Sequence, residues 1–248
     1  MKKKISIIMI CLNSEKTIQK SIKSFNLQKY SNKELIVIDG GSTDKTINIV
    51  KNSDGVNYFE EIKNLGLYAS LNYGIKKSNG EIVGILHSDD EFYDENILDN
   101  INDCFSKDLD EVDYVYSNIV FVDKEDKIKR KWDVGEIRKN DIFLGKIPPH
   151  TGIYVKKSTF FKTGYYNEYF KISSDIEYIF RLFTEKTFKG KYLNVFTLKM
   201  KLGGLSTKSL KNKLYGLFES YIALKNIKIG YLKSFLVILL KVFRKLRK

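Results

Sequence analysis

The fold is decided by residues 34–44, ELIVIDGGSTD, in which a short apolar run leads directly into an acidic turn that contains two glycines. Residues 81–90, EIVGILHSDD, repeat this arrangement of an apolar run followed by acids. Short apolar runs bounded by turn residues are typical of buried strands. Because strand carboxyl ends line the ligand crevice of an open α/β sheet, we expect Asp39, Asp89 and Asp90 to surround one pocket.

Strand-like and helix-like segments alternate over the first 105 residues. The expected strands cover residues 5–12, 34–38, 56–61 and 81–86, and the expected helices cover 17–28, 45–51, 68–78 and 95–105. The first helix is predicted because Ile18, Ile22 and Phe25 recur at helical spacing. Asn13 or Ser14 is available as its cap. This alternation indicates a mixed, mostly parallel central sheet flanked by helices.

The pattern changes after residue 106. An antiparallel hairpin is predicted over 114–122 and 128–132, and further strands over 153–155 and 192–198. A helix is expected to begin at Ser174 or Asp175, because Ile179, Leu182 and Phe183 then share one face. The second half therefore continues the α/β fold with less regular order.

The positive charge is unevenly distributed along the chain. The sequence holds 43 Lys and Arg against 30 Asp and Glu, a net charge of +13. Residues 199–248 contain 13 of the basic residues and a single acid, Glu219, so the preceding body is nearly neutral. A nucleic-acid site would place basic groups on the folded body, interleaved with stacking aromatics. We therefore expect no nucleic-acid partner.

Cysteine usage points to a reducing compartment. The chain has two cysteines, Cys11 and Cys104, in no CxxC spacing. Residues 1–12 do not resemble a secretory signal, because three lysines lead into an apolar run of eight residues. A cytoplasmic protein is expected.

The C-terminal stretch, residues 231–248, is basic and amphipathic. Its longest apolar run, residues 235–240, is far shorter than the roughly 20 residues needed to span a bilayer. On a helical wheel its apolar side chains share one face opposite the basic ones, and they are Leu232, Phe235, Leu236, Leu239, Phe243 and Leu246. This pattern favours an interfacial membrane helix. A terminal helix packed on its own domain, with a solvated basic face, is the alternative.

The turn at Asp39 suits a planar ligand. The two glycines that follow let the backbone turn sharply and leave room for a flat ring. A simple Asp-Gly turn without a ligand is the alternative. Ser42, Thr43 and Asp44 are better explained as caps of the next helix than as ligand contacts.

Asp89 and Asp90 are adjacent, so one carboxylate can face a metal ion while the other points to the opposite side of the cleft. Two acids at one site are costly without a cation. Mg²⁺ and Mn²⁺ prefer oxygen ligands, often one or two carboxylates together with substrate phosphates. We expect Asp90 to contact the metal. An acidic loop at a helix start is the alternative, because Asp94 and Glu95 also suit a first helical turn.

Four motifs in order carry a resemblance to a known family. They are SIIMICLN at 6–13, IDGGSTD at 38–44, GLYASLNYGI at 66–75 and SDD at 88–90. The chain resembles family 2 glycosyltransferases, inverting enzymes of the GT-A fold that act in bacterial surface-polysaccharide synthesis. The resemblance covers residues 4–206. It implies a nucleotide-binding half over 1–105 and an acceptor half over 106–206. The charge and apolar pattern of the remaining residues, 207–248, predicts a basic amphipathic helical tail after this domain.

The resemblance assigns roles to these acids. It implies that Asp39 contacts the nucleotide base, that Asp89 lies at the ribose, and that Asp90 binds Mn²⁺ or Mg²⁺. The motif at 66–75 is similar to the family's helix beside the diphosphate and donor sugar, which implies sugar-side contacts for Tyr68 and Asn72. Helix packing is the equal alternative for both residues.

Residues 173–182, SSDIEYIFRL, resemble the family's acidic helix start, whose Asp is the general base. The resemblance therefore implies that Asp175 is catalytic, and a purely capping role is the alternative. Ser174 stands where relatives often carry an acid, which leaves Glu177 as a possible substitute.

The sequence does not decide the roles of several polar residues near these motifs. His87, His150, Lys199 and Lys201 can face substrate, or can be packed or solvated side chains. Nothing in the residue pattern separates these alternatives.

These observations predict an inverting, metal-dependent transfer of a sugar from a nucleotide sugar, a UDP-sugar, to a saccharide hydroxyl. The acceptor is expected to be lipid-linked, because the basic tail would hold the enzyme peripherally at the inner face of the cell membrane. A nucleotidyltransferase is a weaker alternative, because residues 11–17 lack the glycines of a phosphate loop. A non-catalytic nucleotide-sugar-binding partner of a membrane polysaccharide assembly is another.

Overall fold

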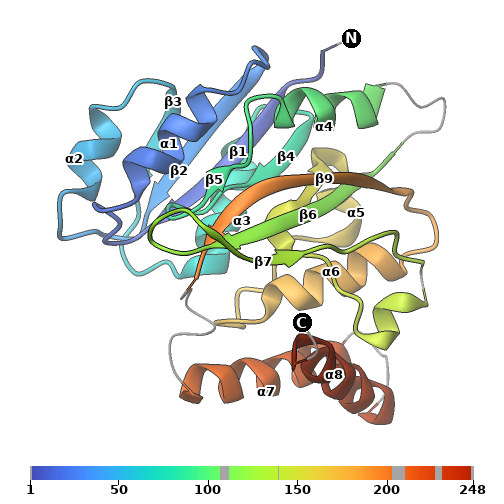
Figure 1. Ribbon diagram of the computed structural model, residues 1–248. Coiled ribbons are helices and arrows are strands. Elements are labelled where there is room, and N and C mark those ends of the chain that lie inside the picture. Colours follow the sequence, from blue (N-terminus) through green and yellow to red (C-terminus); the bar gives the residue numbers. More distant parts are fainter. Residues whose placement is uncertain (1, 107–111, 139, 203–209, 227–230, 247–248) are drawn as a thin grey trace.

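A single mixed sheet organises the computed structural model, which describes residues 2–106, 112–138, 140–202, 210–226 and 231–246 (Figure 1). Among these residues the strand order is β3-β2-β1-β4-β8-β6-β9-β5, and β7 pairs with β6 at the side. The strands are β1 Ile5–Cys11, β2 Lys33–Asp39, β3 Val56–Glu61, β4 Ile82–Ile85, β5 Glu91–Phe92, β6 Tyr114–Val122, β7 Ile128–Trp132, β8 Ile153–Lys156 and β9 Gly190–Lys201.

Helices connect and cover these strands. They are α1 Ile18–Asn26, α2 Thr46–Lys51, α3 Leu67–Lys77, α4 Ile97–Ser106, α5 Lys157–Thr163, α6 Ser174–Thr184, α7 Leu210–Asn226 and α8 Tyr231–Leu246, with the short 3-10 helices η1 Asp141–Leu144 and η2 His150–Gly152. The predicted α/β class is confirmed. The sequence did not predict β5, α5 or the 3-10 helices, all of which are short, and β9 is longer than expected at both ends.

The first half of the sheet is parallel, as predicted. β2 pairs with β1 and β3, and β1 pairs with β4, all in parallel register. Each connection returns through a helix, which is the right-handed crossover arrangement that parallel strands require. The second half is mixed, because β8 runs antiparallel to both β4 and β6, whereas β9 runs parallel to β6.

Side-chain alternation along the strands divides the core into two layers. On β1, Ile5, Ile7 and Met9 face α1, α2 and α4, while Ile8 faces α3 and α6 on the other side of the sheet. All four side chains are fully buried. A strand that is apolar on both faces must be covered on both faces, which explains the continuous apolar run at residues 5–12.

The predicted cap of α1 is wrong. The helix begins after Thr17, and neither Asn13 nor Ser14 caps it through a side chain. Asn13 instead adopts a left-handed conformation, with φ at 50°. Its side-chain oxygen accepts hydrogen bonds from Thr43, and the hydroxyl of Ser14 lies 2.9 Å from that of Ser88. Both side chains therefore connect neighbouring loops at the carboxyl edge of the sheet.

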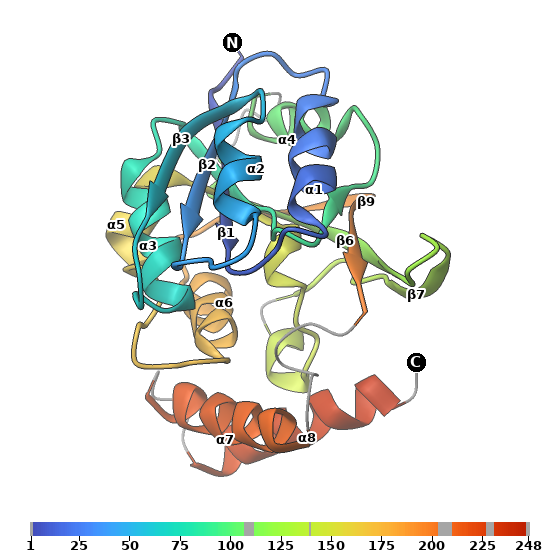
Figure 2. The same cartoon turned by 90° about the vertical axis from the view of Figure 1, so that its left-hand side faces the viewer.

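The C-terminal helices form a layer beneath α6 (Figure 1 and Figure 2). α7 packs against α6, and α8 packs against α7 and η1. On α8 the buried side chains are Ser234 and Val237, while Phe235, Leu236 and Leu239 are exposed. Within the described part of the chain, the predicted apolar face of α8 is therefore left exposed at Phe235, Leu236 and Leu239. None of the described helices is both long enough and apolar enough to cross a membrane.

One close approach fixes the position of α3 on the sheet. A Cβ atom added to Gly74 would lie 2.6 Å from Cγ2 of Ile8. Ile8 is fully buried, so its side chain has little room to move. The helix can lie this close to β1 only because position 74 carries no side chain.

We predict that Gly74→Ala lowers the free energy of unfolding. The gain in helix propensity is about 1 kcal/mol, whereas overpacking a rigid core typically costs about 1–3 kcal/mol. Urea unfolding followed by circular dichroism measures the difference. Lys23→Ala, at an exposed helical position, serves as the control and should change the midpoint little. Unchanged stability of Gly74→Ala would contradict the close packing.

Candidate active site

The ends of three adjacent parallel strands define the candidate site. Cys11, the last residue of β1, pairs with Asp39, the last residue of β2. β4 continues this edge, because the N–H of Leu86 donates to the carbonyl of Ile8. The chain then runs directly into the predicted acids, Asp89 and Asp90. The register therefore places the two acidic turns at one edge of the sheet, as expected for a crevice.

Asp39 is fully buried at this edge. Its carboxylate accepts hydrogen bonds from the N–H groups of Gly41 and Ser42, at 2.8 and 2.6 Å, and from the Ser42 hydroxyl at 2.6 Å. The thiol of Cys11 lies 3.3 Å from the same carboxylate. Burial and the neighbouring Asp39 raise the pKa of Cys11 above its usual range. Asp39 thus holds the shape of the turn in addition to any contact with a ligand.

The residues after Asp39 do not all act as helix caps. Asp44 accepts a hydrogen bond from the N–H of Thr46, the first residue of α2, at 2.9 Å, although the cap position itself is Lys45, whose side chain makes no capping bond. Ser42 instead bonds to Asp39 and to the N–H of Asn13. Thr43 donates its N–H to the side chain of Asn13 at 2.8 Å. These bonds join the β1–α1 loop to the β2–α2 loop.

Asp89 and Asp90 have different surroundings. Asp89 is partly exposed, and its pKa is raised mainly by burial. Asp90 is only 1% exposed, and burial followed by the charge of Asp89 raises its pKa well above the usual value. A hydrogen bond from the backbone of Lys201 and the charge of Lys201 act in the opposite direction. The backbone of Lys201 therefore contacts Asp90, and its charge acts on both acids.

The side chain of Asp90 fits a divalent cation. Its Oδ2 atom is buried and has no hydrogen-bond partner in the described part of the chain. A buried carboxylate oxygen without a partner is costly, and a bound cation would remove that cost. No group of three His, Cys, Asp or Glu side chains among the described residues could hold a metal alone. A cation here would need ligands from a bound molecule, which is the usual arrangement for Mg²⁺ or Mn²⁺ with phosphates.

Asp175 lies in the first turn of α6 and is partly accessible, with 22% of its side chain exposed. Its Oδ1 accepts the N–H of Ile176 at 2.9 Å and lies 3.3 Å from the hydroxyl of Tyr68. Its Oδ2 lies 3.4 Å from Nδ1 of His150. The carboxylate is therefore held by groups from three elements while one side remains open.

Tyr68 and Asn72, predicted on the donor-sugar side, both lie on the buried face of α3. The hydroxyl of Tyr68 donates to the carbonyl of Ile172 at 2.6 Å, which positions it beside Asp175. The amide of Asn72 donates to the carbonyl of Tyr166 and the carboxylate of Glu168, both at 2.8 Å. Its oxygen accepts the N–H of Tyr166 at 2.9 Å. Both polar atoms of the Asn72 side chain therefore have partners within the protein, as expected if this residue serves helix packing.

A pair of histidines connects the acidic loop with Asp175. Nε2 of His87 lies 2.9 Å from Nε2 of His150. Burial lowers the pKa of both rings, that of His87 to about 3. Two neutral rings satisfy this contact when His150 carries its proton on Nδ1, toward Asp175, and accepts from His87 on Nε2. The sequence had left the role of both histidines open.

Glu177, the possible substitute base, is paired with Arg181. Its side chain is 8% exposed, and its carboxylate accepts two hydrogen bonds from Arg181, at 2.7 and 2.8 Å. Arg181 also donates to backbone carbonyls, including that of Tyr165 at 2.7 Å. This pair fixes the loop before α6, and Asp175 is the carboxylate of this helix start that remains open.

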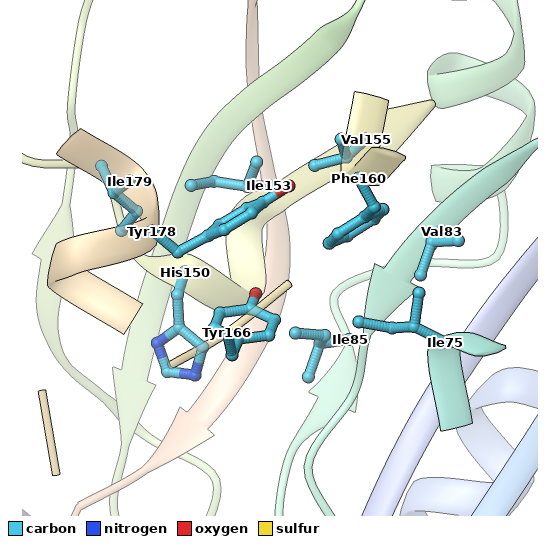
Figure 3. Close-up of a pocket in the computed structure, with 10 residues that line it drawn as sticks. All are labelled: Ile75, Val83, Ile85, His150, Ile153, Val155, Phe160, Tyr166, Tyr178 and Ile179. Atoms are coloured by element: carbon cyan, nitrogen blue, oxygen red, sulfur yellow. The ribbon is translucent and has the colours of Figure 1, made fainter. Parts of the chain in front are cut away.

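His150 forms the polar end of a small, otherwise apolar pocket (Figure 3). Aliphatic side chains of β4, β8 and α3 line the pocket together with the aromatic rings of Phe160, Tyr166 and Tyr178. The rings of Tyr166 and Tyr178 lie 4.7 Å apart. His150 therefore lies between this pocket and the carboxylate of Asp175.

Comparison with solved structures finds the same architecture. S. aureus TarS 1–349 in complex with UDP-GlcNAc aligns with a TM-score of 0.68 at 18% identity, covering 96% of this chain and 71% of that one. The mannosyltransferase PcManGT from Pyrobaculum calidifontis, in complex with GDP-Man and Mn²⁺, aligns with a TM-score of 0.69 at 15% identity, covering 96% and 70%. These similarities confirm the predicted GT-A fold.

Sequence comparison finds glycosyltransferases. An uncharacterised glycosyltransferase of Haemophilus influenzae is 38% identical over 102 residues, which are 40% of this chain and 41% of that protein. A PGL/p-HBAD biosynthesis glycosyltransferase of Mycobacterium tuberculosis is 25% identical over 207 residues, covering 81% of this chain and 78% of that protein. The chain spans less than half of the length of the Haemophilus relative and 23% of a Rickettsia conorii glycosyltransferase that is 32% identical.

The family assignment rests on most of the folded body. The model of the family named glycosyl transferase family 2 matches residues 6–170, which include β1 to β8 and both acidic turns. This range is well over half of the 248 residues. The chain therefore belongs to glycosyl transferase family 2.

Proposed function

We propose that this glycosyltransferase moves a sugar from a UDP-sugar to a hydroxyl group of a saccharide acceptor, with inversion at the anomeric carbon. The observation that carries the proposal is the unpartnered, buried carboxylate oxygen of Asp90 at the carboxyl edge of the sheet. Asp90 follows Asp89 directly, at the same strand edge as the buried Asp39. An acidic crevice of this kind suits a nucleotide diphosphate that arrives with a divalent cation.

The donor half of the site consists of the two acidic turns. We assign Asp39 to the nucleotide base, Asp89 to the ribose, and Tyr68 and Asn72 to the support of the sugar side. Complexes of TarS with UDP-GlcNAc and of PcManGT with GDP-Man, both similar in fold, support a nucleotide-sugar donor. Lys201, whose charge acts on both acids, can also approach the diphosphate.

Asp90 is the residue that would hold the cation. A bound Mn²⁺ or Mg²⁺ would neutralise charge on the leaving diphosphate. Mn²⁺ in the PcManGT complex supports the use of a divalent metal.

The acceptor half centres on Asp175. We assign its carboxylate as the general base that takes the proton of the acceptor hydroxyl as the hydroxyl oxygen bonds to the anomeric carbon. The bond between that carbon and the diphosphate oxygen breaks, and UDP leaves with the bonding electrons. Partial exposure of Asp175 and its contact with His150 support this assignment, because the base must be reachable yet fixed in orientation.

A lipid-linked saccharide acceptor is favoured by the surface of the C-terminal helices. α7 exposes Leu214, Tyr215 and Phe218, and α8 exposes Phe235, Leu236 and Leu239. The surrounding sequence, residues 199–248, is strongly basic. Exposed apolar side chains within a basic segment suit an anionic membrane surface. We therefore propose peripheral membrane contact through α7 and α8.

A non-catalytic nucleotide-sugar-binding protein is the main alternative. It would keep the donor half and lack turnover. The open carboxylate of Asp175 favours an enzyme over this alternative. A nucleotidyltransferase receives no support from the family match.

We predict that Asp175→Asn lowers sugar transfer by a factor of roughly 10²–10⁴, because the amide cannot accept the proton. UDP release from a panel of UDP-sugars, with lipid-linked saccharides as acceptors, measures this loss. UDP affinity in Mn²⁺ should remain unchanged, because the donor half is intact. Asp54→Asn, at an exposed position before β3, should retain full turnover.

Near-normal turnover of Asp175→Asn would show that another group is the base. Tight UDP binding by the wild-type chain without turnover of any donor would favour the non-catalytic alternative instead.

We predict that the double variant Phe218→Ser/Phe235→Ser binds anionic vesicles at least about tenfold more weakly than the wild type. Burying one large apolar side chain contributes about 1.5–3 kcal/mol, so losing two exceeds a factor of ten. Co-sedimentation with phosphatidylglycerol vesicles measures the change. Half-molar salt should weaken binding of the wild type, because it screens the basic residues.

The matched control replaces exposed apolar side chains elsewhere. Leu27 is 59% exposed, like Phe235, and Phe161 is 73% exposed. Leu27→Ser/Phe161→Ser should bind vesicles as the wild type does. Equal binding by both double variants would contradict docking through α7 and α8.

A further inference from the structure

Glu219 is a buried acidic residue within a basic segment of the chain. Glu219 is the single acidic residue of residues 199–248, yet its side chain on α7 is 4% exposed. It accepts three backbone hydrogen bonds, from the N–H groups of Lys171, Ile172 and Ser173, at 2.8, 2.7 and 3.1 Å. A carboxylate that accepts several backbone N–H groups fixes the conformation of that segment strongly.

The segment held in this way, residues 171–173, leads into α6 and ends two residues before Asp175. Ser173 precedes the helix without capping it through its side chain. Its hydroxyl donates instead to the carbonyl of Gly216 on α7, at 2.8 Å, and accepts a hydrogen bond from Ser220 at 3.0 Å. α7 therefore supplies the polar contacts that fix the start of the helix.

The opposite side of the same segment contacts the candidate active site. The carbonyl of Ile172 accepts the hydroxyl of Tyr68 at 2.6 Å, and that hydroxyl lies 3.3 Å from Asp175. Residues 171–173 are thus held between Tyr68 on α3 and Glu219 on α7. A shift of this segment would move the carboxylate of Asp175 relative to the acceptor.

We propose that Glu219 is a positioning residue, which holds the start of α6 so that Asp175 meets the acceptor hydroxyl. The inference rests on the proposed function of Asp175. In this proposal α7 helps to position a catalytic group, in addition to its proposed contact with a membrane. This role of Glu219 also explains why one buried acid stands within a segment whose other charged residues are basic: its partners include three backbone N–H groups, which need an acceptor, in addition to the side chain of Tyr215.

Glu219→Gln tests the proposal with little change of shape. The amide keeps one acceptor oxygen and turns an NH₂ group toward backbone N–H donors, so part of the set loses its partner. We expect kcat to fall by a factor on the order of 10², because small misplacements of catalytic groups have effects of this size. UDP affinity should stay within twofold of the wild type, because none of Asp39, Asp89 and Asp90 contacts the segment 171–173 through a described hydrogen bond.

Hydrogen exchange gives a readout that does not depend on turnover. In Glu219→Gln the amides of residues 171–176 should exchange faster, while those of β1 and β4 keep their protection. Ser220→Ala, which removes one hydroxyl contact to Ser173, should show a smaller version of both effects. Glu81→Gln carries the same chemical change at an exposed side chain on the far edge of the sheet, and it should behave like the wild type.

Unchanged kcat together with unchanged exchange at 171–176 would overturn the proposal. Faster exchange with unchanged kcat would overturn it as well, because Glu219 would then hold the segment without affecting catalysis by Asp175. If the wild-type chain turned over no UDP-sugar, the proposed function would fail and the catalytic role of Glu219 with it. Exchange would still report on the contact with α7.

Discussion

Parallel pairing of β2, β1 and β4 ends three neighbouring strands at one edge of the sheet, and the site depends on this register. Cys11 lies beside Asp39, and the chain after β4 follows the same edge to Asp89 and Asp90. Helices on both faces bury the strands, so the acids emerge from an apolar layer where an unpaired charge is costly. The proposed binding of a cation and phosphates by these acids rests on this position.

The position of Asp175, the proposed base, depends on contacts from outside this sheet edge. α6 brings Asp175 to the crevice, while α3 and α7 hold the segment before it through Tyr68 and Glu219. The contact between His87 and His150 joins the two sides, because one ring follows β4 and the other contacts Asp175. The proposed donor and acceptor functions therefore belong to separate elements, which are joined by a short series of polar contacts.

Much of this arrangement was predictable from local pattern. Apolar runs with turn residues gave the strands of the parallel half, and the hairpin at β6 and β7 was predicted with its observed bounds. Asp39, Asp89 and Asp90 were identified because they follow such runs. The partners of Asn72, His87 and Glu219 were not predictable, because they lie far away in sequence and are set by tertiary packing. Asn13 was misjudged as a cap for the same reason, since its partner Thr43 lies on another loop.

Calorimetric titration with UDP, in Mn²⁺ and again in EDTA, tests most directly whether Asp90 and its strand edge form a metal-dependent donor site. The account predicts that the wild type binds UDP in Mn²⁺ and loses most of this affinity in EDTA. Asp90→Ala should bind weakly under both conditions, while Asp54→Ala should match the wild type. Equal UDP affinity with and without Mn²⁺, or full affinity in Asp90→Ala, would contradict the account.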